Sequence, residues 1–212
     1  MNPKNTYHET LANTIIKNME KRQIEACYCK TKEEAVAKAE SYLTKDSVVS
    51  FGGSVTLTES GMMDALKSNP DITLLDRDLA KTPEERTEIL HKALSCDFYF
   101  MSSNAITTDG KLVNTDGTGN RTAALIYGPK NVIILAGMNK VVKDEAAGIA
   151  RIHEKAAPPN CIRLNKNTPC ANTSVCGDCQ SPDCICCQTV ITRRSAIPNR
   201  IKVILIEEEF GY

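Results

Sequence analysis

Along the first three quarters of the chain, apolar residues occur in two kinds of pattern: at every fourth position, as on one face of a helix, or in short continuous runs. Leu11, Ile15 and Met19 recur every fourth residue, which places them on one face of a helix over residues 7–22. Short apolar runs alternate with helical patterns of this kind, and such runs are typical of buried strands. They predict strands over residues 24–29, 47–51, 72–75, 97–101, 131–136 and 201–206.

Capping residues and prolines delimit the helices between these strands. Thr31 with Glu34 forms a capping box, and Thr82 followed by Pro83 and Glu85 marks a second helix start. The first expected helices run from Thr31 to about Leu43, from a start between Thr56 and Ser60 through Leu66, and from Thr82 to about Leu94. A short helix is expected after Asn120, and a longer one from Lys143 to Ala157. Pro158-Pro159 is expected to end this last helix.

The alternation of strands and helices predicts an α/β fold with a mainly parallel sheet that helices cover on both faces. One hairpin is expected over residues 104–113, with its turn at Thr108-Asp109-Gly110. Because the sequence contains no internal repeat and no long linker, residues 1–212 are expected to form a single domain. The regular pattern ends after Ala157. Residues 161–192 are interpreted as a cysteine-rich metal-binding segment, followed by one more strand of the same sheet.

The charge balance argues against several classes of partner. The chain has 26 basic and 26 acidic side chains, and its densest basic step is Arg193-Arg194. The balance favours neither nucleic acid, nor an acidic substrate, nor an anionic membrane as partner, and we expect no nucleic acid to bind. No apolar run approaches the ~20 residues of a membrane span, and the N-terminal residues lack the apolar core of a signal peptide. These features predict a cytoplasmic protein.

The distribution of the ten cysteines is more informative than their number. Six of them fall within 18 residues: Cys170, Cys176, Cys179, Cys184, Cys186 and Cys187. Because a disulfide scaffold spreads its bridges over the fold, this clustering favours a metal site over disulfides or free thiols. A set of four thiolates suits zinc or an iron–sulfur cluster. The scattered thiols are interpreted as small buried or half-buried apolar groups: Cys27, Cys29, Cys96 and Cys161.

Two glycine-containing loops follow predicted strands. Gly52-Gly53-Ser54 exposes backbone N–H groups that favour an anion, although the same residues also suit a simple turn. In the second loop, residues 115–121, Arg121 could hold a carboxylate or phosphate, or make a structural ion pair. Asp116 could act as a base, bind a hydroxyl or cap the turn. Since ligands of open α/β sheets collect beyond the carboxyl ends of strands, both loops are expected to open onto one cleft.

Three segments of the sequence resemble the LUD-domain family, which includes lactate utilization proteins. They are residues 49–57 around Gly52-Gly53, residues 104–114, and the run from Asp116 through Lys130 to Gly137-Met138-Asn139-Lys140. The resemblance implies a three-layer fold similar to ribose-5-phosphate isomerase and the CoA transferases, with glycine loops around a small-molecule cleft. The candidate cleft residues that it implies are Gly52, Gly53, Ser54, Asn104, Asp116, Gly117, Gly119, Asn120, Arg121 and Lys140. It assigns no catalytic residue.

The cysteine segment resembles the C-terminal segment of one branch of that family. By this resemblance the metal ligands are Cys170, Cys176, Cys179 and Cys186, and the sequence departs from the pattern with two further thiols, Cys184 and Cys187. The redox pathway of the relatives favours an iron–sulfur cluster, whereas a compact stabilising site would suit zinc.

The resemblance implies a component of L-lactate oxidation that binds a small anionic metabolite and works with other lactate-utilization proteins. Two alternatives remain open. A CoA transferase- or isomerase-like enzyme with structural zinc would place a carboxylate such as Glu59 or Asp116 in the cleft. A non-catalytic assembly subunit would expose an apolar patch beside the cysteine segment. The sequence contains no dinucleotide-binding fingerprint, so neither NAD nor flavin is expected.

Overall fold

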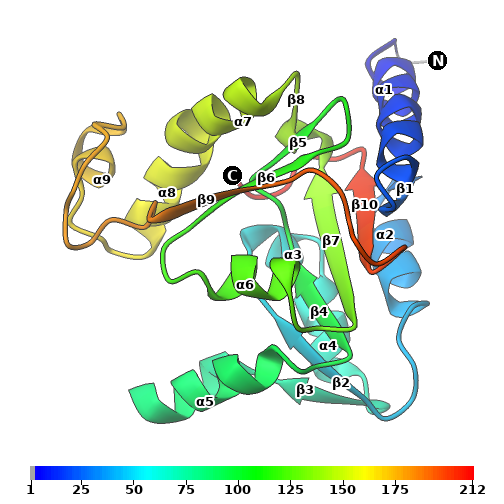
Figure 1. Cartoon of the computed structure of the whole chain (residues 1–212), viewed down its shortest axis with the longest axis horizontal. Coiled ribbons are helices and arrows are strands. Elements are labelled where there is room, and N and C mark those ends of the chain that lie inside the picture. The colour runs from blue at the N-terminus through cyan, green and yellow to red at the C-terminus, as the bar shows by residue number, and fades with distance from the viewer. Residues whose placement is uncertain (1–2) are drawn as a thin grey trace.

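Six parallel strands form the central sheet of the protein, whose computed structural model describes residues 3–212 (Figure 1). The strands lie in the order β1-β10-β7-β4-β2-β3, and every neighbouring pair is parallel. Their bounds are β1 Glu25–Cys29, β2 Ser47–Phe51, β3 Ile72–Leu75, β4 Phe98–Met101, β7 Asn131–Gly137 and β10 Ile201–Ile206. The mainly parallel sheet is thus confirmed. Its last strand in the sequence, β10, lies between β1 and β7 rather than at an edge.

Helices cover both faces of this sheet, which gives the fold three layers. Along β7, Val132 and Ile134 face one core whereas Ile133 and Leu135 face the other, because successive side chains of a strand point to opposite faces. The first core is covered by α1 Pro3–Glu20, α5 Pro83–Ala93 and α6 Asn120–Ile126. The second is covered by α2 Lys32–Glu40, α3 Val55–Glu59 and α4 Met62–Ser68.

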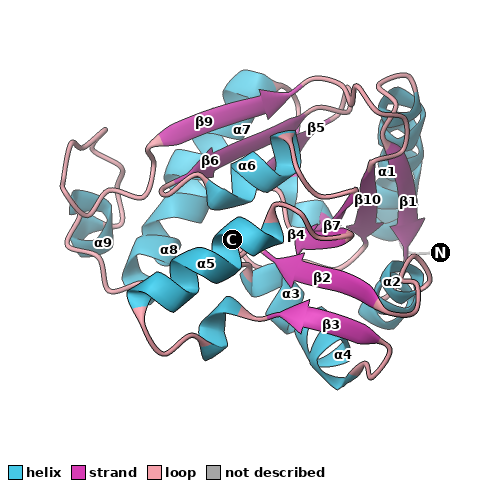
Figure 2. Cartoon of the chain, turned by 60° about the horizontal axis from the view of Figure 1, so that its bottom comes forward, coloured by secondary structure: helices cyan, strands magenta, loops and turns pink. Residues whose placement is uncertain are grey.

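A second sheet packs against the first core (Figure 2). Its strand order is β8-β5-β6-β9, with bounds β5 Ala105–Thr107, β6 Leu112–Asp116, β8 Val141–Val142 and β9 Gln188–Thr192. The hairpin turns where it was predicted. Gly110 has a φ of +88°, and a Cβ there would lie 2.9 Å from the Met19 backbone nitrogen. Strand β9 was not expected, since its exposed and largely polar residues show no apolar period.

The prediction that Pro158-Pro159 ends a helix was wrong. α7 (Glu145–Arg151) continues through a π-helical turn at Ile152–Ala156 into α8 (Ala157–Arg163). The two prolines lie in the first turn of α8, directly after the π-helical turn, whose altered hydrogen-bond spacing accommodates them. Cys161 therefore lies on a helix that packs against the cysteine segment.

Two shorter helical features complete the chain. The single helix expected through Leu66 is divided into α3 and α4 at Gly61, whose φ is +83°. Within the cysteine segment, α9 spans Pro169–Thr173 and packs against α8 (Figure 1). None of the helices in residues 3–212 combines the length and the apolarity needed to cross a bilayer.

Candidate functional site

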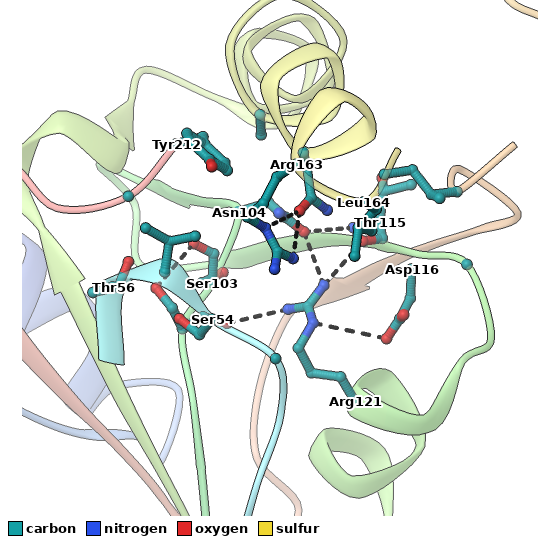
Figure 3. A pocket seen from close by; sticks show the side chains of 18 of the residues that line it. Ser54, Thr56, Ser103, Asn104, Thr115, Asp116, Arg121, Arg163, Leu164 and Tyr212 are labelled. Atoms are coloured by element: carbon teal, nitrogen blue, oxygen red, sulfur yellow. Dashed lines mark hydrogen bonds and ion pairs between the residues drawn. The ribbon is translucent and has the colours of Figure 1, made fainter. Parts of the chain in front are cut away.

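Loops that leave the carboxyl ends of neighbouring parallel strands meet at one cleft with a volume of about 300 Å³ (Figure 3). Arg77 follows β3, Ser54 and Thr56 follow β2, Ser102 and Asn104 follow β4, Lys140 follows β7, and Tyr212 follows β10. The opposite wall comes from the end of β6, the start of α6, and α8. The cleft therefore lies where the fold brings together segments that are far apart in the sequence.

Most of the cleft residues implied by the sequence line this cavity. They are Gly53, Ser54, Asn104, Asp116, Gly117, Asn120, Arg121 and Lys140. Gly52 and Gly119 lie outside the lining. A Cβ at Gly52 would lie 3.0 Å from Cγ of Arg121, so this glycine makes room for the arginine behind the cleft. Gly119 has a φ of +87° and is the N-cap of α6. Ligand binding by these residues stays a prediction.

Arg121 is held by the protein itself. Its four terminal N–H groups donate to oxygens, at 2.5–3.1 Å, of Ser102, Asn104, Asn114 and Thr115. Its Nε lies 3.7 Å from a carboxylate oxygen of Asp116 (Figure 3). Because these partners already use the terminal donors, Arg121 joins the β4–β5 loop to β6 and contributes mainly its charge to the cleft.

Arg77 lines the cleft and was not among the residues expected there from the sequence. Its side chain is 14% exposed, and among residues 3–212 it donates no hydrogen bond, with its Nε buried and without a partner. Asp78 is its closest carboxylate, at 3.8 Å from Nε. A Cβ at Gly53 would lie 2.5 Å from Nη2, so Gly53 provides the space for this guanidinium. The sequence could have indicated this residue, because Arg77 lies just beyond the predicted strand over residues 72–75.

Lys140 is 4% exposed at the end of a 3-10 turn, Met138–Lys140, after β7. Its Nζ donates to Oγ1 of Thr56 at 2.7 Å and to Oγ of Ser102 at 3.0 Å. Burial lowers the pKa of Lys140 to about 7, with a smaller contribution from the positive charges of Arg151 and Arg121. The amine is therefore partly neutral near pH 7.

The cysteine segment encloses a second cavity, of about 90 Å³. All four predicted ligands line it together with two further thiols: Cys161, Cys170, Cys176, Cys179, Cys184 and Cys186. Burial and the neighbouring thiols raise the pKa of Cys186 to about 12. Nowhere in residues 3–212 are three His, Cys, Asp or Glu side chains arranged as metal ligands. The structure thus gathers the thiols around one cavity without placing them at ligand spacing.

Cys161 is buried, as expected, although the helix α8 that carries it was not expected to continue past the prolines. It is 1% exposed and lines the second cavity from α8. Ile185 lines both cavities, and a Cβ at Gly117 would lie 3.3 Å from its Cα. The cysteine segment therefore forms one wall of the cleft.

Comparison with known proteins identifies the family. Residues 12–206 match the LUD domain. The chain belongs to the LUD-domain family. A DUF162 family protein from Deinococcus radiodurans has a similar crystal structure, with a TM-score of 0.54, 11% identity, and coverage of 94% of this chain and 98% of that one. At this identity the likeness shows a common fold.

Weaker structural similarities concern two structures from Chaetomium thermophilum. For eIF2B delta the TM-score is 0.34 and the identity 19%, and the alignment covers 52% of this LUD-domain chain and 48% of the eIF2B delta chain. For the eIF2B-beta2-delta2 complex the TM-score is 0.40 and the identity 17%, and the alignment covers 84% of this chain and 56% of the matched chain. No curated protein matches the sequence.

The depressed pKa of Lys140 predicts a pH-dependent stability of this LUD domain. The unfolded chain keeps the proton up to the ordinary pKa of 10.5, whereas the folded protein releases it at about 7. Between these values the unfolded state binds more protons, so the free energy of unfolding rises with pH. Relative to a Lys140→Met variant, the wild type should gain about 2 kcal/mol between pH 7 and about pH 9.

Urea unfolding of both proteins across this range measures the effect. The groups that act on the amine are Arg151 of α7, Arg121 of α6 and Glu59 of α3, and only Glu59 opposes the shift. A constant difference in the free energy of unfolding across the range would show that Lys140 titrates in the folded protein as it does in the unfolded chain.

Proposed function

We propose that this LUD-domain protein binds a small 2-hydroxy or 2-oxo acid, such as L-lactate, in the cleft and takes part in its oxidation in the cytoplasm. The observation that carries the proposal is Arg77, whose buried Nε has no hydrogen-bond partner among the described residues and whose ion-pair contact with Asp78 is long, at 3.8 Å. An arginine of this kind offers a pair of parallel N–H donors to a carboxylate.

The charge of the cleft supports an anionic ligand. Its lining contains five basic side chains: Arg77, Arg121, Lys140, Arg163 and Lys166. The one carboxylate side chain of the lining within the described chain belongs to Asp116, and Arg121 lies 3.7 Å from it. Hydroxyl groups of Ser54, Ser102 and Ser103 surround the same space and suit the C2 oxygen of the ligand.

The two carboxylates considered for a transferase- or isomerase-like enzyme do not favour that alternative. Asp116 pairs with Arg121 and accepts a hydrogen bond from the backbone nitrogen of Thr122 at 3.0 Å. Glu59 is exposed, lies outside the cleft lining and accepts from the backbone nitrogen of Gly211 at 2.6 Å. Neither carboxylate is thus left free in the cleft to act on a ligand.

We also propose that Cys170, Cys176, Cys179 and Cys186 hold an iron–sulfur cluster or, alternatively, zinc. The support is that these four thiols, which the family resemblance implies, share one cavity. A thiol-lined cavity fits either group, and a cluster would supply electron transfer whereas zinc would stabilise the segment. Cys161 and Cys184 line the same cavity and offer alternative ligands.

A role alongside other lactate-utilization proteins belongs to the same proposal. Its support is three exposed apolar side chains in or near the cysteine segment: Ile162 is 55%, Leu164 is 42% and Val175 is 67% exposed. Such side chains would let an electron-transfer partner approach the thiol cavity.

The ligand proposal predicts that Arg77→Gln weakens the binding of L-lactate and pyruvate by at least about tenfold, since a hydrogen-bonded charge pair is lost. Isothermal titration calorimetry measures the affinity. Arg194→Gln, at an exposed arginine outside the cleft, is the matched control and should bind as the wild type does. Equal affinity of Arg77→Gln and the control for both acids would reject the proposed site.

A further inference from the structure

Lys140 has the features of a reactive amine rather than of a structural cation. Lysine is almost never fully buried in proteins unless a carboxylate pairs with it. Lys140 is 4% exposed, yet no Asp or Glu in the described chain lies within ion-pair distance of its Nζ. Its closest partners are two hydroxyl groups, so the site does not compensate a full positive charge.

The two hydroxyl groups leave one position on the nitrogen free. The hydroxyl of Thr56 donates to the backbone oxygen of Phe210 at 3.3 Å, so it acts as an acceptor toward Lys140. A neutral amine has two N–H groups, and Thr56 and Ser102 accept both. Since Lys140 lines the cleft, the remaining position, which carries the lone pair, is available to a ligand there.

We propose that Lys140 is a nucleophile that forms a reversible imine with the C2 carbonyl of a 2-oxo acid held in the cleft. The inference rests on the proposed function, since the cleft must first bind the acid. Nζ attacks C2, an N–C bond forms, and the bond from C2 to the carbonyl oxygen breaks. The two amine protons leave with that oxygen as water, and nothing is oxidised or reduced.

The surroundings of Lys140 suit this step. A desolvated lysine beside other cations is neutral, and therefore nucleophilic, at a pH at which an exposed lysine is protonated. Thr56 and Ser102 fix the position of Nζ, which lowers the entropic cost of attack. The guanidinium of Arg77, whose Nε makes no hydrogen bond within the described chain, would hold the carboxylate of the acid in the same cleft while its neighbouring carbonyl meets the amine.

The test incubates the whole protein with pyruvate and sodium cyanoborohydride, which reduces an imine to a stable secondary amine. Mass spectrometry of the intact protein and of its peptides then counts and locates the adducts. We expect a single major adduct, on Lys140. The Lys140→Met variant should form at least about tenfold less of it. Lys155→Met, which alters an exposed lysine outside the cleft, should form as much as the wild type.

Calorimetry with pyruvate in the same buffer separates this inference from the proposed function. If pyruvate binds but no adduct forms on Lys140, the imine is overturned and the binding site stands. Adducts spread over exposed lysines, or retained in Lys140→Met, overturn it as well. If pyruvate does not bind at all, the proposed function itself fails. Because the peptide map is made on the wild type, the test stays decisive even if Lys140→Met does not fold.

Discussion

Replacing Arg121 by methionine should lower the free energy of unfolding by about 3–5 kcal/mol, the usual cost of breaking a buried ionic network. The substitution keeps most of the apolar stem but removes every donor. It would leave Asp116, whose side chain is 13% exposed, without its positive partner. It would also remove the hydrogen-bond donor from the oxygens that accept from Arg121, which belong to Ser102, Asn104, Asn114 and Thr115.

Guanidinium chloride unfolding followed by circular dichroism measures this loss. The matched control is Arg86→Met, because Arg86 is 46% exposed and pairs with Asp78 at 3.4 Å; it should cost less than about 1 kcal/mol. Arg121→Lys should fall between the two, since lysine has three donors and lacks the planar fork. If Arg121→Met costs no more than the control, the arginine does not join the β4–β5 loop to β6.

The second large effect concerns metal content. On protein purified without oxygen, we expect Cys176→Ser to retain less than about a tenth of the metal of the wild type, because a Cys-x2-Cys turn supplies two of the four proposed ligands. Residues 161–192 should then exchange their amide hydrogens faster. Elemental analysis, acid-labile sulfide and the absorption spectrum make the measurement.

Cys187→Ser is the matched control for that loss. Cys187 belongs to the same segment but is exposed and lies outside the thiol cavity, so its variant should keep the metal. Iron with sulfide and a broad band near about 400 nm would support electron transfer, whereas colourless zinc would make the site structural. A wild type without metal, or equal metal in both variants, would reject the ligand assignment.

The wall shared by the two cavities links these predictions. Ile185 lines both, and the backbone nitrogen of Cys187 donates to the oxygen of Asp116 at 3.0 Å. The cysteine segment is therefore fixed to the end of β6, where Asp116 lies. A change of order in that segment should alter the shape of the cleft, so the affinity for L-lactate is a useful second readout for Cys176→Ser.

Local patterns predicted the framework because they reflect local physics. Ser47–Phe51 and Ile72–Leu75 have the bounds expected from their apolar runs. Thr31 and Thr82 cap their helices through side-chain oxygens, as their spacing to Glu34 and Glu85 predicted. Each of these features is decided by a few residues that lie next to one another in the chain.

Features that depend on distant partners were not predictable in this way. Strand β9 exists because its backbone pairs with β6, and its polar side chains carry no period that would reveal it. Pro158-Pro159 permits two outcomes, a helix end or the first turn of a new helix. The preceding π-helical turn, which the sequence does not announce, decides between them.

The amino-acid sequence was sufficient to predict the strands of the central sheet, most helices, and eight of the residues that line the cleft. What those residues are free to do depends on the folded structure. Arg121 uses its terminal donors on the β4–β5 loop and on β6, whereas Nε of Arg77 makes no hydrogen bond within the described chain and Lys140 is buried without a carboxylate. Hydrogen-bond satisfaction and desolvation depend on everything that surrounds a group in space, and no local pattern of residues encodes that environment.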